Sequence, residues 1–169
     1  LATRERMERT ERKASETAQL LGELRKAKYT PGVTLNDWLE KHHQPEAQNG
    51  LSAVELLKRP EITLSALAEL SPEIRQFGKP AQEQAEISVK YEGYLERQET
   101  LIRHARQMEE TLLPEDLPYE EVTGLRIEAR QKLMKQRPRS LAAASRIPGV
   151  SPADVAVLMV FLEKHKGNA

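Results

Sequence analysis

Basic side chains crowd residues 130–146, where their types and spacing could bind phosphate. Six of these residues are Arg or Lys and none is acidic: Arg130, Lys132, Lys135, Arg137, Arg139 and Arg146. A guanidinium is a planar fork that matches phosphate geometry, while lysine supplies a point charge. A helix end, a Pro-containing turn and a second helix start would present them on one side, enough for roughly two or three phosphates. The alternative is a solvated charged face without a partner.

A second candidate for phosphate binding is the segment 147–153, which reads Ile-Pro-Gly-Val-Ser-Pro-Ala. It resembles a helix-hairpin-helix turn, which offers backbone N–H groups and a helix N-terminus to phosphate. A second glycine would normally stand at the position of Ser151. Ser151 is explained more simply as the N-cap of the next helix, with Pro152 at its first helical position.

Residue sets suited to catalysis are not evident in this sequence. The absence of Cys removes disulfides, thiolate metal sites and cysteine nucleophiles, and is compatible with a reducing cytoplasm. His42 and His43 would point about 100° apart on a helix, too far to share one ion easily. The glycines are scattered and form no Gly-x-Gly-x-x-Gly nucleotide turn. We therefore expect no catalytic, cofactor-binding or metal-binding residue in this chain.

Charge is balanced over the chain but divided along it. The formal net charge is zero, with −4 over residues 1–119 and +4 over residues 120–169. The C-terminal end is therefore the better place for an anionic partner. Aromatic residues make up only 4% of the chain, which favours thin helical layers over one thick core. No apolar run approaches the roughly 20 residues that span a membrane.

Helix signals follow one another along residues 1–80. Residues 4–27 are rich in strong helix formers. Thr34 is a candidate cap for a short helix, and Ser52 with Glu55 has capping-box spacing. Pro60 ends that helix, Thr63 can cap the next one, and residues 71–73 combine a cap with a proline. We expect a subdomain of short helices behind one longer N-terminal helix.

The strongest periodic signal predicts a long helix over residues 81–112. Its apolar positions alternate at spacings of four and three, as in a heptad, with Gln98 as the polar member: Ile87, Tyr91, Tyr94, Gln98, Leu101, Ala105, Met108 and Leu112. We expect this row to pack against neighbouring helices, with Tyr91 and Tyr94 in the core. Gly93 inside the helix predicts the close approach of another backbone.

Three further helices are expected after Pro114 and Pro118, near residues 125–136, 140–147 and 152–165. Ser140 and Ser151 are their expected caps. The fold class is therefore all-α, with short helices and one long helix leading into a C-terminal three-helix bundle. The expected domains are residues 1–80 and residues 81–169.

Several motifs in order resemble one known family. Residues 89–94, Val-Lys-Tyr-Glu-Gly-Tyr, followed by Arg97 and Gln98, are similar to the central signature of the C-terminal region of the MnmG (GidA) family. The resemblance covers essentially the whole chain and is most specific over residues 86–160. It includes Leu56–Pro60, Leu113-Pro114, Tyr119, Gly124-Leu125, Lys132-Leu133, Arg137-Pro138, Ala144–Ile147, Gly149-Val150 and Pro152-Ala153.

The resemblance implies a non-catalytic part of a larger enzyme. Members of the family bind FAD, use NADH and, with the partner GTPase MnmE, install a carboxymethylaminomethyl-type group on the wobble uridine of certain tRNAs. Their flavin domain is N-terminal to the region seen here, and the C-terminal region is a helical docking module for the GTPase and tRNA. A cytoplasmic, homodimeric parent protein is expected.

Under this resemblance we expect tRNA at the six basic residues of the segment 130–146. We expect the partner protein on the less charged flank of the last helix, near Val157, Val160 and Phe161. The alternative is a helical scaffold or coiled-coil dimerisation module, without nucleic-acid binding, in which residues 81–112 pair with a second copy.

Overall fold

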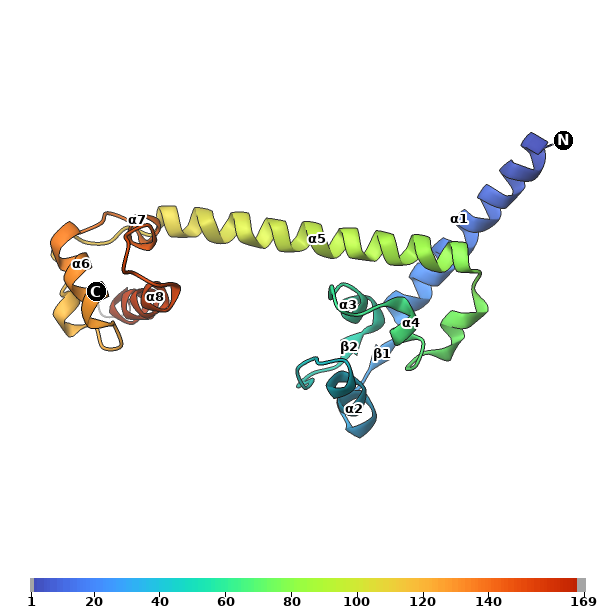
Figure 1. Ribbon diagram of the computed structural model, residues 1–169, viewed down its shortest axis with the longest axis horizontal. Coiled ribbons are helices and arrows are strands. Elements are labelled where there is room, and N and C mark those ends of the chain that lie inside the picture. The colour runs from blue at the N-terminus through green and yellow to red at the C-terminus, as the bar shows by residue number, and fades with distance from the viewer. Residues whose placement is uncertain (1, 167–169) are drawn as a thin grey trace. The chain divides into compact units, whose positions relative to one another are not determined.

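The computed structural model describes residues 2–166, and their regular structure is helical apart from two very short strands (Figure 1). The all-α prediction is confirmed. The chain divides into two compact units, residues 1–97 and residues 98–169. Helix start and stop signals in the sequence predict a domain boundary between residues 80 and 81, where the long helix begins. The boundary between the two compact units lies between residues 97 and 98, within that helix.

The first unit contains a strand pair among helices. Its elements are α1 (Ala2–Lys26), β1 (Lys28–Tyr29), α2 (Val33–Lys41), β2 (Leu51–Ser52), α3 (Ala53–Leu57), α4 (Leu64–Leu67), the 3₁₀ helix η1 (Pro72–Gln76) and the beginning of α5 (Lys79–Glu110). The two strands are antiparallel, with Lys28 opposite Ser52 and Tyr29 opposite Leu51. Leucines dominate its core, which includes Leu20, Leu24, Leu39, Leu56, Leu57, Leu64 and Leu67 around Trp38.

Local capping explains where the short helices begin. Ser52 and Glu55 form the predicted capping box, and the Thr63 hydroxyl accepts a hydrogen bond from the backbone N–H of Ala66. The expected cap at Thr34 is wrong, because α2 begins at Val33 and its N-cap is Gly32, two residues before Thr34.

The long helix α5 is confirmed, but the prediction of its packed face is wrong. Most of the row expected in the core is exposed, with Ile87 at 60%, Tyr91 at 62% and Leu101 at 61% of their accessible surface, whereas Met108 is partly buried against the core of the second unit. The buried residues of α5 are Ala81, Ala85, Val89 and Gly93. Small side chains on this face let the helix approach the first unit's core closely, and a periodicity of large apolar residues does not reveal such a face.

The turn that follows α3 is held against α5 by Lys90, Gly93 and Arg97. The ammonium group of Lys90 donates to the backbone carbonyl oxygens of Arg59 and Ile62. Arg97 donates to the carbonyl oxygen of Lys58 at 3.1 Å. Gly93 lies against the backbone of Lys58, which confirms the predicted close approach.

The second unit is the predicted three-helix unit. After the end of α5 it contains the 3₁₀ helix η2 (Tyr119–Glu121), α6 (Ile127–Gln136), α7 (Leu141–Ser145) and α8 (Pro152–Lys166). Leu113 donates to the carbonyl oxygen of Arg139, and Leu141 donates to that of Thr111, so the segment after α5 pairs with the segment before α7. Its core includes Leu117, Tyr119, Leu125, Leu133, Leu141, Ile147, Val155 and Leu158.

No helix within residues 2–166 combines the length and the apolar character needed to cross a membrane.

Candidate functional site

Arg137, one of the six predicted phosphate-binding residues, is built into the second unit. It ends α6 in the left-handed conformation, with φ 45°, and its backbone N–H donates to Leu133. Its guanidinium donates to the carbonyl oxygens of Glu115 and Leu117, each at 3.0 Å, and lies 5.4 Å from the ring centre of Tyr119. Burial raises the pKa of Tyr119, and the positive charge of Arg137 opposes that rise. Arg137 therefore joins α6 to the segment before η2.

Two more of the six basic residues, both arginines, already have protein partners. Arg130 is partly buried and donates to the carbonyl oxygen of Val122 at 2.9 Å. Its Nε atom is buried without an acceptor among the described residues. Arg146 forms an ion pair with Glu109, and both side chains are more than half exposed. An exposed pair of this kind is worth little and can be exchanged for another anion.

The remaining three cations are exposed and uncommitted. Lys132, Lys135 and Arg139 take part in no ion pair or side-chain hydrogen bond that the structure describes. Lys132 and Lys135 are three residues apart on α6, a spacing that puts them on one face of the helix. Arg139 follows directly after the turn that Arg137 makes. Of the six basic residues, three are therefore unpaired among the described residues, Arg130 and Arg137 bond to the backbone of the unit, and Arg146 forms an exposed ion pair.

The turn before α8 is organised by the carboxylate of Asp154. This side chain is almost fully buried and accepts hydrogen bonds from the backbone N–H and hydroxyl of Ser151 and from the backbone and guanidinium of Arg126. Burial by itself would raise the pKa of Asp154, but these hydrogen bonds outweigh it and lower the pKa to about 2. The Ser151 hydroxyl in turn accepts from the backbone N–H of Asp154 at 3.3 Å, which confirms Ser151 as the N-cap.

This turn is a poor phosphate site. The carboxylate of Asp154 already neutralises the positive end of α8. A second carboxylate lies beside Gly149, where a Cβ atom would come within 2.9 Å of Glu128 Oε1. A phosphate would meet two negative charges, so the N-cap interpretation explains the segment and the helix-hairpin-helix comparison does not.

Helix α8 is apolar on every side. Eight successive residues, 155–162, are apolar, and only part of this surface is covered by the second unit. Val155 and Leu158 are buried in the core, whereas Val160 is 51% exposed. A helix that is apolar all round is normally covered on all sides.

One uncovered side of α8 lines a groove of about 490 Å³. Val157, Val160 and Phe161, the three residues predicted to contact a partner protein, all line it. The other lining residues are Glu121, Thr123, Ala156 and Lys164. Gly124 has φ +99° and packs its backbone against Val157, which brings the loop after η2 onto one end of the groove.

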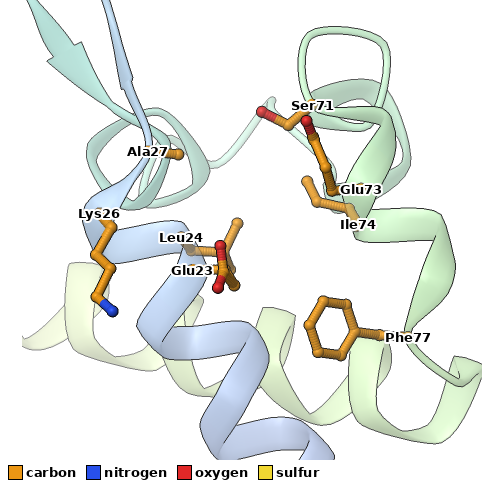
Figure 2. Close-up of a pocket in the computed structure, with 8 residues that line it drawn as sticks. All are labelled: Glu23, Leu24, Lys26, Ala27, Ser71, Glu73, Ile74 and Phe77. Atoms are coloured by element: carbon orange, nitrogen blue, oxygen red, sulfur yellow. The ribbon is translucent and has the colours of Figure 1, made fainter.

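A pocket in the first unit was not foreseen from the sequence. It measures about 340 Å³ and lies between the end of α1 and η1 (Figure 2). Figure 2 shows the side chains of Leu24, Ile74 and Phe77 around its floor, with Glu23 and Lys26 on α1. At its edge the hydroxyls of Tyr29 and Ser71 share a hydrogen bond. Only the Ser-Pro-Glu helix start at residues 71–73 marked this region in the sequence.

The described residues do not fit a flavin, a nicotinamide nucleotide or a metal ion. The only strands within residues 2–166 are β1 and β2, two residues each and antiparallel, and neither leads into a glycine-rich turn. No group of three or more His, Asp or Glu side chains in the same range is placed to hold a metal ion.

Comparisons with known proteins match the chain along both units. Residues 4–99 match the family described as the tRNA modifying enzyme MnmG/GidA C-terminal helical domain. Residues 101–169 match the family described as the MnmG/GidA C-terminal helical bundle. A solved structure of Aquifex aeolicus GidA is 26% identical, covering 94% of this chain and 24% of that chain, with a TM-score of 0.38.

Curated relatives are much longer than this chain. The tRNA uridine 5-carboxymethylaminomethyl modification enzyme MnmG of Alkaliphilus metalliredigens is 40% identical over 98% of this chain, and this match covers 26% of the relative. The enzyme of the same name from Syntrophobacter fumaroxidans is 43% identical over 86% of this chain and 23% of its own. The chain spans about a quarter of these relatives. It belongs to the MnmG/GidA family and corresponds to the C-terminal helical domains of that family.

Proposed function

We propose that this chain is a non-catalytic docking module of an FAD-dependent enzyme that modifies the wobble uridine of tRNA. It would dock the partner GTPase MnmE and help to hold the tRNA. FAD and NADH would be bound by the part of the parent enzyme that this chain does not cover, in a cytoplasmic homodimer. Membership in the MnmG/GidA family supports this proposal, and so does the name of its relatives as tRNA uridine modification enzymes.

One observation carries the proposal. After packing, the second unit keeps two unused surfaces of different chemistry: the cations Lys132, Lys135 and Arg139, and the apolar groove on α8. Neither surface contains the paired groups that acid–base or nucleophilic catalysis needs. Unused charge and unused apolar surface are features of binding sites.

The cationic surface suits the tRNA backbone. Three free cations can neutralise about three phosphates, and each released counterion adds to the salt dependence of binding. Arg146 can add a fourth contact if it leaves Glu109, since their exposed ion pair contributes little. Arg130 and Arg137 would act indirectly, by holding α6 and the loop around it in place.

The groove on α8 suits a partner protein. Val157, Val160 and Phe161 give it an apolar centre, and polar residues surround that centre. Protein interfaces have this arrangement of apolar core and polar rim. We assign MnmE to this groove and the tRNA to the cations.

Competition with the whole enzyme tests the proposal. The isolated chain, added in excess to a reconstituted modification reaction of a full-length family member with MnmE, should inhibit the reaction as its concentration rises. A chain carrying Lys135→Glu, Arg139→Glu and Val160→Asp should not inhibit. Equal inhibition by both chains would contradict the proposal.

The exposed row on α5 favours a second candidate, a coiled-coil dimerisation module. Ile87, Tyr91, Tyr94 and Leu101 are each half exposed or more and keep heptad spacing. In that case the chain would form dimers at micromolar concentration, and Leu101→Asp would abolish them. Analytical sedimentation of the wild-type chain and of Leu101→Asp tests for these dimers. This candidate also requires that neither protein binds tRNA or MnmE.

A further inference from the structure

The rim of the α8 groove carries one charge of each sign. Glu121 and Lys164 both line the groove, and neither forms an ion pair among the described residues. The two unpaired rim charges are therefore available to an occupant.

These charges lie toward opposite ends of the groove. Gly124 packs on Val157, so the segment that carries Glu121 and Thr123 reaches the groove at the end where Val157 stands. Lys164 is seven residues further along α8, at the other end. The C-terminal end of α8 also carries the negative end of its dipole beside Lys164, His165 and Lys166. The groove thus has a direction, acidic at one end and basic at the other.

We infer that the groove receives an amphipathic helix of a partner protein that offers a basic side chain to Glu121 and an acidic side chain to Lys164. Between those charges the helix would place apolar side chains on Val157, Val160 and Phe161. The inference rests on the proposed function and adds to it the chemistry and the direction of the docking segment. A helix in reverse would bring like charges together at both ends.

The dimensions of the groove favour a helix. From Ala156 to Lys164 the floor follows one face of α8 for about 12 Å, at about 1.5 Å per residue. Two turns of a partner helix cover this length, with apolar anchors three and four residues apart. The exposed Val160 stands between the two charges and would be the central anchor.

Rim charges of this kind determine orientation and association rate more than they determine affinity. The apolar floor and the charged rim should therefore respond differently to substitution. Loss of the floor removes the docking, whereas reversal of a rim charge weakens it in a salt-dependent way.

The experiment titrates purified MnmE from the same source against the chain and its variants at low and high salt. The floor variant is Val160→Asp, and the rim variants are Glu121→Lys and Lys164→Glu. Matched controls are Glu120→Lys and Lys166→Glu, which reverse neighbouring exposed charges that do not line the groove. Circular dichroism and unfolding midpoints establish that each variant is folded.

We expect Val160→Asp to weaken binding by more than about ten-fold. Each rim variant should weaken binding by about three- to ten-fold at low salt and less at high salt, with the controls unchanged. If Val160→Asp weakens MnmE binding but the rim variants bind MnmE as tightly as the wild type, the inference of a charged partner helix is overturned and the proposed function stands. If the wild type does not bind MnmE, or Val160→Asp binds as well as the wild type, both are overturned.

Discussion

Gly93 of α5 packs directly against the backbone of Lys58. A Cβ atom on Gly93 would lie 3.0 Å from the carbonyl oxygen of Lys58 and 3.3 Å from its Cα. The same turn is bonded to α5 by Lys90 on one side of Gly93 and by Arg97 on the other. Within residues 89–98, the segment whose motif resembles the family, Lys90, Gly93 and Arg97 therefore hold the turn after α3 against the long helix.

This close approach predicts a stability difference between two glycines. Gly93→Ala should lower the free energy of unfolding by up to about 2 kcal/mol, because overpacking costs about 1–3 kcal/mol and alanine restores about 1 kcal/mol of helix propensity. Gly22→Ala in α1 meets nothing within 4 Å, so it should raise stability by about 0.5–1 kcal/mol. Urea unfolding measures both, and shifts in the same direction would contradict the packing described here.

Asp154 predicts an acid-sensitive contribution to stability. Its pKa is about 2 in the folded chain and 3.8 ordinarily, a difference worth about 2 kcal/mol. Because the folded pKa is depressed, this stabilisation is complete well above pH 3.8 and is lost as the pH falls toward 2. Asp154→Asn should therefore cost about 2 kcal/mol at pH 7 and about half of that at pH 3.

Urea unfolding of the wild type and Asp154→Asn at several pH values checks this prediction. The difference between the two proteins isolates Asp154 from other carboxylates. Glu115→Gln, at an exposed position, is the control and should change stability by less than about 0.5 kcal/mol. A wild-type-to-Asn difference that did not change with pH would be inconsistent with the hydrogen bonds from Ser151 and Arg126.

Arg137 and Arg139 are predicted to have opposite roles although they are two residues apart. Arg137→Ala removes two hydrogen bonds from a charged donor and should cost about 2 kcal/mol of unfolding free energy. Arg139→Ala removes an exposed side chain and should change stability by less than about 0.5 kcal/mol. Thermal unfolding distinguishes them, and equal destabilisation would show that Arg137 is no more structural than its neighbour.

The free cations predict how tRNA affinity depends on salt. Lys132→Ala, Lys135→Ala and Arg139→Ala should each weaken tRNA binding and reduce the slope of log affinity against log salt by about 0.7–0.9. Lys41→Ala, at a lysine in the first unit that pairs with Glu69, is the control and should leave the slope unchanged. Filter binding over a range of salt concentrations measures the slopes, and a slope unaffected by all three variants would remove this surface from the tRNA site.

Features set by neighbours in the sequence could be predicted well. Ser52 with Glu55, Thr63 and Ser140 cap helices as expected, because an N-cap depends only on residues two or three positions ahead. The strand pair between Lys28–Tyr29 and Leu51–Ser52 was missed, since two residues are too few to show an alternating pattern.

Most features set by distant partners could not be predicted from the sequence, although Gly93 did predict the close approach of another backbone. The heptad row marked the apolar face of α5 correctly, but which face is covered depends on Lys58, 35 residues before Gly93. Likewise, the sequence does not distinguish the six basic residues of the segment 130–146. In the structure, Arg130 and Arg137 donate to backbone carbonyl oxygens and Arg146 pairs with Glu109. Val157, Val160 and Phe161 belong to an apolar run of eight residues, which is longer than one buried face requires, and they line a groove. Their contact with a partner protein stays a prediction.

Direct titration of the purified chain with MnmE and, separately, with tRNA at two salt concentrations tests the docking function most directly. We expect binding to both, with tRNA affinity falling steeply as salt rises. Binding to neither ligand by a chain whose circular dichroism shows it to be folded would contradict the proposal that these helical domains form a docking module.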